Sequence, residues 1–283
     1  MSPRLDAHQH FWRLDQGEYA WIDRADPVLC RDYIPDDLAP LLDLAGIQRT
    51  IVVQAESTVA ETRRLLALAE ATPFIAGVVG WVDLLAPEDT LVETLSELCQ
   101  SPYLVGIRPT LPRRPEYTAT LSPLQIRNLR NVADRNLCID WLVTLQQLPI
   151  IADAMERVPG LTAVVDHLGQ ASEVTASWSS TMCKLAQFPT CYCKVSGIAT
   201  LGGEDKHSED TLHTVVEHVW DAFGPERLLF GSDWPVCLTA GTSYHGVVEL
   251  TQHVLPKLSA DETAAVFGGS AIRCYGLSEV NRV

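Results

Sequence analysis

Histidine and acidic residues follow several short apolar runs in this 283-residue sequence. His8 and His10 lie two residues apart at the end of the first run. Asp166 and His167 follow a later run, and Asp233 follows the last. Imidazole is the most common protein ligand for metal ions and also a general acid or base near neutral pH. A carboxylate can accept a proton from a water nucleophile or complete a metal site. These residue types indicate hydrolytic chemistry if the fold brings them together.

The apolar runs that must position these residues are typical of buried parallel strands, because several are continuous and not alternating. Amphipathic stretches with helical spacing lie between them. Ser122 with Pro123 indicates one helix start, and Ser259 with Glu262 matches a capping box at another. The expected strands are residues 5–10, 50–55, 74–82, 103–109, 137–143, 161–169, 191–197 and 228–235. Eight strand–helix units predict a (β/α)8 TIM barrel, with residues 1–283 as one domain.

In such a barrel the carboxyl ends of all strands meet at one face, where active sites form. His8 and His10 share one side of their strand, because side chains two residues apart point the same way. Both imidazoles should therefore point into the barrel mouth. His167 and Asp233, at the ends of the sixth and eighth strands, should meet them there.

Two long irregular segments should lie over the same face, because each follows a strand. Residues 11–35 are rich in aromatic side chains, and residues 198–210 are polar and contain glycine. Trp12 and Trp21 in the first segment are candidates for a wall of the substrate site. Loops of this kind carry function more often than the scaffold does.

Composition narrows the class of protein. The net charge of −15 disfavours nucleic acids and anionic membranes as partners, since both attract basic surfaces. No apolar run approaches the roughly 20 residues of a membrane span, and the first ten residues lack a signal-peptide pattern, so a cytoplasmic location is expected. The eight cysteines form no CxxC pair. Cys191 and Cys193 are expected to be small buried hydrophobic residues.

Several segments resemble the amidohydrolase superfamily: DAHQHFW, VGWVDL, VGIRP, DHLG, CKVSG and LLFGSDWP. The chain is most similar to the amidohydrolase-2 branch of sugar-lactone hydrolases, the fuconolactonase-like and rhamnonolactonase-like proteins. The resemblance implies a metal-dependent-hydrolase type of barrel and a role in carbohydrate metabolism. It implies that Asp233 activates water for attack on a lactone carbonyl, with His167 and His10 as further catalytic residues. It also implies a metal site formed by His8, His10, His167 and Asp233.

The sequence departs from the family pattern at two places. Relatives often carry a histidine after the fifth strand, where this chain has Gln146 and Gln147. The fourth strand ends in Arg108, so the carboxylated lysine of binuclear members is missing at that position. At most one divalent ion, with zinc as the first choice, is therefore expected in place of two, a site that works without metal stays open, and no organic cofactor is expected.

Four further residues are expected to bind the substrate. The forked guanidinium of Arg108 can hold a ring carbonyl or carboxylate and stabilise an oxyanion. Lys194, at the end of the seventh strand, offers a second cation, and a structural role in an ion pair stays open for it. Trp81 and Asp83 follow the third strand and suit a sugar, because an indole covers C–H faces and a carboxylate accepts hydrogen bonds from hydroxyls.

Three functions stay open from the sequence. The first is hydrolysis of a sugar aldonolactone. The second is a sibling reaction on the same scaffold, either hydrolysis of a pyrone dicarboxylate or muconolactone or a metal-dependent decarboxylation. Those acidic substrates need several cations, and only Arg108, Lys194, Arg113 and Arg114 are at hand. The third is an inactive barrel that serves as a binding protein. A small-molecule lactone is the expected partner, and the sequence leaves a homo-oligomer open.

Overall fold

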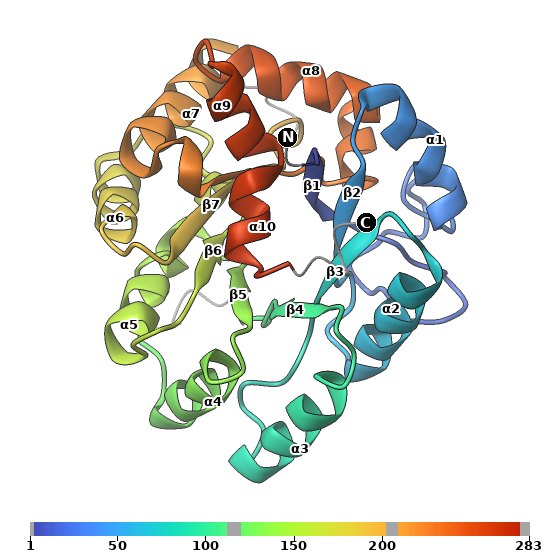
Figure 1. Ribbon diagram of the computed structural model, residues 1–283, viewed down its shortest axis with the longest axis vertical. Helices are drawn as coiled ribbons and strands as arrows, with labels where there is room; N and C mark the ends of the chain where they lie inside the picture. The colour runs from blue at the N-terminus through green and yellow to red at the C-terminus, as the bar shows by residue number, and fades with distance from the viewer. Residues whose placement is uncertain (1–2, 112–119, 202–208, 278–283) are drawn as a thin grey trace.

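The computed structural model describes residues 3–111, 120–201 and 209–277. Its eight parallel strands form one sheet in the order β1 to β8, with each strand paired to the next in sequence. The strands are β1 (Leu5–Gln9), β2 (Arg49–Val53), β3 (Ile75–Gly80), β4 (Leu104–Ile107), β5 (Cys138–Trp141), β6 (Ala163–Val165), β7 (Cys191–Val195) and β8 (Leu228–Phe230). Figure 1 shows them around a central axis with helices outside, which confirms the predicted (β/α)8 barrel.

The helices follow the strands as predicted. The main helices are α1 (Pro35–Ala45), α2 (Val59–Ala71), α3 (Glu88–Leu98), α4 (Pro123–Ala133), α5 (Pro149–Arg157), α6 (Ala176–Ala186), α7 (Glu209–Phe223), α8 (Tyr244–Val254), α9 (Ala260–Ala264) and α10 (Ser270–Cys274). Ser122 and Ser259 form the predicted capping boxes at the starts of α4 and α9. These two serines fix where each helix begins, because the serine hydroxyl accepts a hydrogen bond from a backbone N–H that would otherwise be unpaired.

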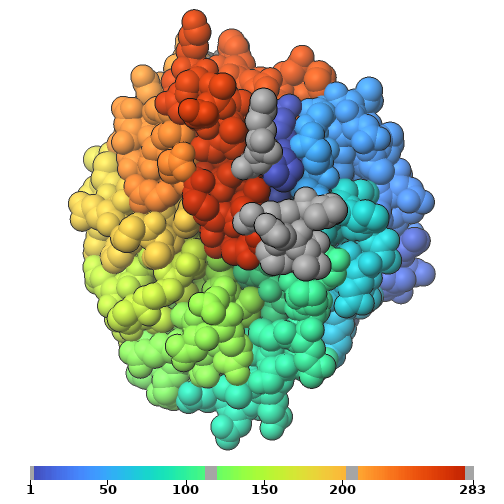
Figure 2. Space-filling model, viewed as in Figure 1, coloured from blue at the N-terminus to red at the C-terminus, as the bar shows by residue number. Residues whose placement is uncertain are grey.

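One end of the barrel interior is filled with apolar side chains. Leu5, Ile51, Val105 and Leu229 form one buried cluster with residues of α10 and the segment after it. Gly268 lies against the backbone at the start of β1, which places this C-terminal segment at the amino ends of the strands. Figures 1 and 2 show the red C-terminal helices crossing the barrel at this end.

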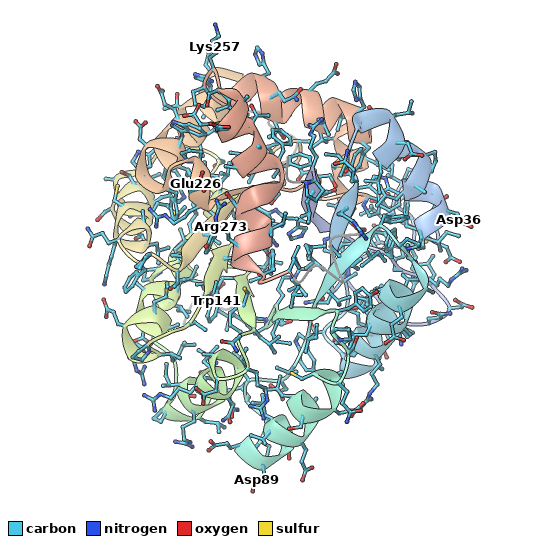
Figure 3. All side chains as sticks on the ribbon, in the orientation of Figure 1. Asp36, Asp89, Trp141, Glu226, Lys257 and Arg273 are labelled. Atoms are coloured by element: carbon cyan, nitrogen blue, oxygen red, sulfur yellow. The ribbon has the colours of Figure 1, made fainter. Side chains whose placement is uncertain are left out.

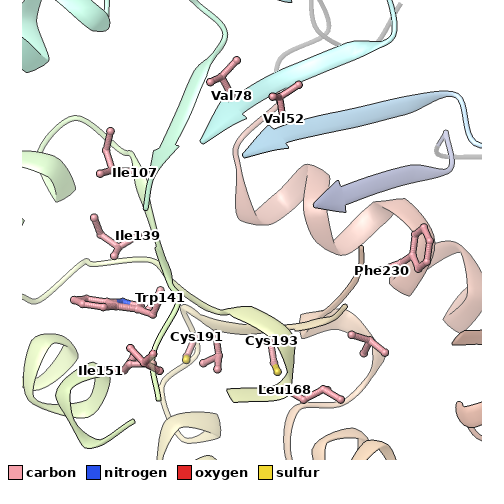
Figure 4. Close-up of a cluster of buried hydrophobic side chains, with 14 of the residues drawn as sticks. Val52, Val78, Ile107, Ile139, Trp141, Ile151, Leu168, Cys191, Cys193 and Phe230 are labelled. Carbon is pink, nitrogen blue, oxygen red and sulfur yellow. The ribbon is translucent and has the colours of Figure 1, made fainter. Parts of the chain in front are cut away.

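A second, larger apolar cluster lies between the strands and the outer helices. Ile139 and Trp141 of β5 pack there with Ile151 of α5, and Figure 4 shows them beside Cys191 and Cys193. Both cysteines are buried and unbridged, which confirms their expected hydrophobic role. Figure 3 shows charged side chains such as Asp36 and Lys257 at the outside of the helix ring.

Strands six and eight are shorter than predicted. β6 ends at Val165 and β8 at Phe230, although the sequence indicated strands to residues 169 and 235. In both places the next residues leave the extended conformation: His167 and Asp233 have φ values of 54° and 56°. The residues that follow both strands stay buried although they are no longer extended, which explains why the sequence indicated longer strands.

Among the described residues, no helix combines the length and apolar character that crossing a membrane requires. Arg113, Arg114 and most of the predicted 198–210 loop lie outside the described residues.

Candidate active site

The barrel closes at the residues that were predicted to carry chemistry. The backbone N–H of Asp233 donates to His8 O at 2.8 Å, and the N–H of His10 donates to Trp234 O at 2.8 Å. These bonds join the end of β1 to the residues after β8. These two backbone bonds therefore fix the positions of both histidines relative to Asp233, which lies just beyond the end of β8.

His8, His10 and Asp233 form a compact group of donor atoms. The two Nε2 atoms lie 3.2 Å apart. Asp233 Oδ1 lies 3.4 Å from His10 Nε2 and 3.7 Å from His8 Nε2. His10 Nδ1 lies 2.7 Å from the carbonyl oxygen of Val53. Because a carbonyl only accepts, His10 carries its proton on Nδ1 and keeps a lone pair on Nε2, facing the group.

This group can hold one divalent cation. Two imidazole nitrogens and one carboxylate oxygen are a common three-residue set for zinc. Ligand atoms on a tetrahedron with bonds of about 2.1 Å are separated by about 3.4 Å. The three separations of 3.2, 3.4 and 3.7 Å are close to that spacing. The residues present therefore fit a mononuclear ion in donor type and in arrangement.

His167 reaches the same group from an unusual backbone conformation. Residues His167, Leu168, Gly169 and Gln170 all have φ between 54° and 65°, in the left-handed region. Each non-glycine residue there costs roughly 1 kcal/mol, and such strain is found at functional sites. Leu168 is fully buried, and its carbonyl accepts a hydrogen bond from Trp178 Nε1 at 3.0 Å. These contacts hold the strained turn in place.

The turn directs the His167 ring onto His8, with ring centroids 4.6 Å apart. His167 Nδ1 lies 2.9 Å from Ser196 Oγ. Gly197 borders the ring, and a Cβ at that position would lie 2.8 Å from His167 Nδ1. Gly197 also has a φ of 64°, so both its conformation and its closeness to the imidazole require glycine.

The Asp233 carboxylate is 5% exposed. Burial alone would raise its pKa, but the interactions with the imidazoles of His167, His10 and His8 outweigh burial and hold the pKa of Asp233 well below its usual value. Asp233 is therefore ionised at neutral pH. Burial lowers the pKa of His8 and His10, so both imidazoles are neutral there and able to donate and accept.

Lys194 lies beneath His8 and is fully buried. Its Nζ is 2.5 Å from Asp140 Oδ2, 3.0 Å from Asp166 Oδ1 and 3.0 Å from His8 Nδ1. Tyr275 OH donates to Asp140 at 2.9 Å. The sequence predicted Lys194 as a substrate ligand, whereas the structure surrounds its ammonium group with protein acceptors.

Arg108 follows the last residue of β4 and is 6% exposed. Its Nη1 is 3.5 Å from both His8 Nε2 and Asp166 Oδ2. Its Nη2 donates to the carbonyl of Gln54, and the Gln54 side chain donates to the carbonyl of Arg108 at 3.3 Å. Arg108 Nε is a buried donor without a hydrogen-bond partner, so one N–H of this guanidinium is unused by the protein.

The other predicted substrate residues differ in exposure. Trp81 follows β3 and has a buried indole N–H without a partner. Asp83 is exposed, and its carboxylate accepts the N–H of Leu85 at 2.8 Å. Trp12 is 2% exposed and donates to Arg31 O within an aromatic group that includes Tyr33.

Trp21 is 47% exposed, and its indole N–H donates to Ala55 O at 2.7 Å, just beyond β2. Trp12 instead lines a pocket of about 90 Å³ together with Tyr19, Glu61 and Arg64. Of the two tryptophans, Trp21 therefore presents more surface to a molecule in solution.

Gln146 and Gln147 occupy the position where relatives carry a histidine after the fifth strand, and Gln147 caps a short helical turn there. Gln147 is buried, and its side-chain oxygen accepts the N–H of Thr144 at 3.0 Å. Gln146 is exposed. Neither is among the residues that could hold a metal within the described part of the chain.

Sequence reasoning missed two buried acids around His8, Asp6 and Asp140. Asp6 accepts the His8 N–H at 3.0 Å and the Ser232 hydroxyl at 2.6 Å, and burial raises its pKa to about 6. Asp140 and Asp166 pair with Lys194. A signal was available for Asp140, since Asp140 and Lys194 each interrupt an apolar strand, and buried opposite charges must pair.

Comparison with known proteins agrees with this geometry. The profile of the amidohydrolase family Amidohydro_2 matches residues 5–277. An L-fucono-1,5-lactonase from Burkholderia multivorans is 37% identical over 294 residues, which cover 98% of this chain and 97% of the relative. An L-fucono-1,5-lactonase from Burkholderia ambifaria is 37% identical over 286 residues, covering 97% and 96%. A crystal structure of a Burkholderia multivorans amidohydrolase with bound zinc superposes with a TM-score of 0.86 at 35% identity, covering 98% of this chain and 100% of that one.

Proposed function

Because this chain belongs to the amidohydrolase family, we propose that it is a sugar-lactone hydrolase whose active site is the His8–His10–Asp233 group with His167. L-Fucono-1,5-lactone, the substrate named for two full-length relatives, is the first candidate. The observation that carries the proposal is the Asp233 carboxylate 3.4 Å from His10 Nε2, positioned by the backbone bonds that join the end of β1 to the residues after β8. The proposal takes the chain as one domain, which the single eight-stranded sheet supports.

Asp233 is proposed as the general base. Its carboxylate accepts a proton from a water molecule while that water adds to the ring carbonyl of the lactone. His10 Nε2 lies beside the carboxylate and helps to orient the water. A lactone is an activated ester, so proton removal together with polarisation of the carbonyl is sufficient for ring opening.

Arg108 and His167 are proposed to stabilise the negative charge that develops on the carbonyl oxygen. The unpaired Nε–H of Arg108 is a preorganised donor in a buried setting, where such donors act most strongly. His167 supplies a second donor from the turn after β6. Trp81, Asp83, Trp12 and Trp21 are proposed to bind or enclose the sugar ring and its hydroxyls.

A divalent cation, with zinc as the first choice, would be held by His8 Nε2, His10 Nε2 and Asp233 Oδ1, with His167 nearby. When bound, such an ion would act as a Lewis acid toward the carbonyl oxygen. The roles proposed for Asp233, Arg108 and His167 are those of the side chains themselves and do not require a bound ion.

A neutral sugar lactone fits the site better than a dicarboxylate. Lys194 is fully buried and surrounded by Asp140, Asp166 and His8, so it does not add a free cation to the site. Among the described residues predicted as substrate cations, Arg108 alone keeps a donor unused by the protein. A pyrone dicarboxylate, with two carboxylates, would need more positive charge.

The test is acid release, followed with a pH indicator, from aldono-1,4-lactones, aldono-1,5-lactones including L-fucono-1,5-lactone, and a pyrone dicarboxylate. Each substrate is measured with enzyme, with enzyme and a chelator, and without enzyme, because 1,5-lactones hydrolyse spontaneously. Turnover of a sugar lactone above the enzyme-free rate supports the proposal. Turnover of the pyrone alone would contradict it.

A further inference from the structure

Lys194 has three acceptor atoms around its amine: Asp140 Oδ2, Asp166 Oδ1 and His8 Nδ1, at 2.5, 3.0 and 3.0 Å. An ammonium group has three N–H donors and no acceptor. The ammonium group has hydrogen bonds to Asp140 Oδ2 and His8 Nδ1 and an ion pair with Asp166, and its charge is balanced by two carboxylates in a place without solvent. The ammonium group can donate to His8 Nδ1 only if that nitrogen carries no proton.

The protonation of His10 completes the pattern. His10 Nδ1 donates to Val53 O at 2.7 Å, so its Nε2 holds a lone pair. A neutral His8 that accepts at Nδ1 carries its proton on Nε2, 3.2 Å from His10 Nε2. The hydrogen bonds then all point one way, from Lys194 through His8 and His10 to the Val53 carbonyl. Every donor in this chain meets an acceptor.

A divalent ion requires a different arrangement at His8. Metal binding by both Nε2 atoms needs a lone pair on each, so the His8 proton would have to move to Nδ1. There it would face an N–H of Lys194 at 3.0 Å, and Asp166 Oδ1 at 3.4 Å would be the nearest carboxylate oxygen to accept it. The ion would also be placed near the lysine charge, and like charges repel strongly where solvent is excluded.

We propose that Lys194 is a positioning residue that holds His8 with its proton on Nε2 and thereby weakens divalent-cation binding by the His8–His10–Asp233 group. In this arrangement the proton of His8 occupies Nε2, the nitrogen that a divalent ion would bind, and donates to His10 Nε2 at 3.2 Å. The inference rests on the proposed function only in taking this group as the active site.

The experiment measures zinc affinity by competition with a chromophoric chelator, using the full chain. Lys194→Met removes the cation, and Lys194→Met combined with Asp140→Asn removes it without changing the net charge. Lys184→Met, at an exposed lysine of α6 paired with Glu156, is the matched control. Zinc should bind at least about tenfold more tightly to both Lys194 variants, and with unchanged affinity to the control. Unchanged or weaker binding by the folded Lys194 variants would overturn the proposal, since a purely structural loss would not tighten zinc binding.

A second measurement on the unaltered protein keeps the test decisive if the Lys194 variants do not fold. Nitrogen-15 NMR of the imidazoles, with His8 assigned by its loss in His8→Asn, reports which nitrogen carries the proton. The metal-free protein should show His8 protonated at Nε2 and His10 protonated at Nδ1. A His8 protonated at Nδ1 would refute the inference. Neither measurement uses a lactone, so failure here and failure of the proposed function are separate results.

Discussion

The two ends of the barrel interior are built on different principles. At the amino ends of the strands, Leu5, Ile51 and Leu229 fill the space with apolar side chains under the C-terminal helix. At the carboxyl ends, buried imidazoles, carboxylates and cations fill a similar space by pairing with one another. Apolar packing stabilises the first end, and hydrogen bonds and ion pairs stabilise the second. Substitutions at the first should therefore affect stability, and substitutions at the second should affect chemistry.

The largest expected effect belongs to the polar end. Asp233→Asn keeps the size of the side chain but removes its ability to accept a proton, so kcat should fall by about 10³-fold. Circular dichroism should show an intact fold, because the backbone bonds of Asp233 with His8 do not depend on the carboxylate. A folded variant with a near-normal rate would remove Asp233 from the mechanism.

A substitution at the apolar end should lower stability and leave kcat nearly unchanged. Ile51 is fully buried in β2. Ile51→Ala should lower the free energy of unfolding by about 2–4 kcal/mol, through lost burial and a residual cavity, while kcat changes little. Urea denaturation measures the first quantity and the lactone assay the second. Leu44→Ala, at a 77% exposed leucine of α1, is the control and should be near neutral. Equal losses of stability in both variants would show that the apolar end is not specially packed.

Tyr275 connects the two ends, since it belongs to the apolar cluster and donates to Asp140 at 2.9 Å. Tyr275→Phe leaves a buried carboxylate with one donor fewer and should cost about 1–2 kcal/mol of stability. The lactone kcat should stay within about twofold, because Lys194 still pairs with Asp140 and Asp166. A large loss of kcat with unchanged stability would mean that the ends are not separable.

The smallest expected effect concerns the pH dependence of kcat/KM, where we expect no change in the range given below. The histidines around Asp233 hold its pKa below the ordinary value of 3.8. The base is therefore ionised at every pH above about 4, and its contribution is lost only as the pH falls further. As the pH is lowered from 7 to 5, kcat/KM should not decrease. A decrease centred near pH 6 would assign the essential base to a different group.

The barrel and the residues at its mouth could be predicted from the sequence, because strand periodicity fixes which side chains share a face. His8 and His10 met Asp233 for that reason. The turn at His167 could not be predicted, because four successive left-handed residues include one glycine only. The partners of Lys194 could not be predicted either: a strand pattern gives the side on which a residue lies, but its contacts depend on the register of neighbouring strands.

The measurement that tests the central claim most directly is a single turnover of the lactone in ¹⁸O-labelled water with enzyme in excess. If Asp233 acts as a base, the water oxygen enters the substrate, and every product molecule carries one label in its carboxylate. If Asp233 attacks the carbonyl itself and water then opens the resulting anhydride at the Asp233 carbonyl, the first product is unlabelled there and the label appears on the protein. Labelled product with unlabelled Asp233 is the predicted result, and label on Asp233 would contradict it.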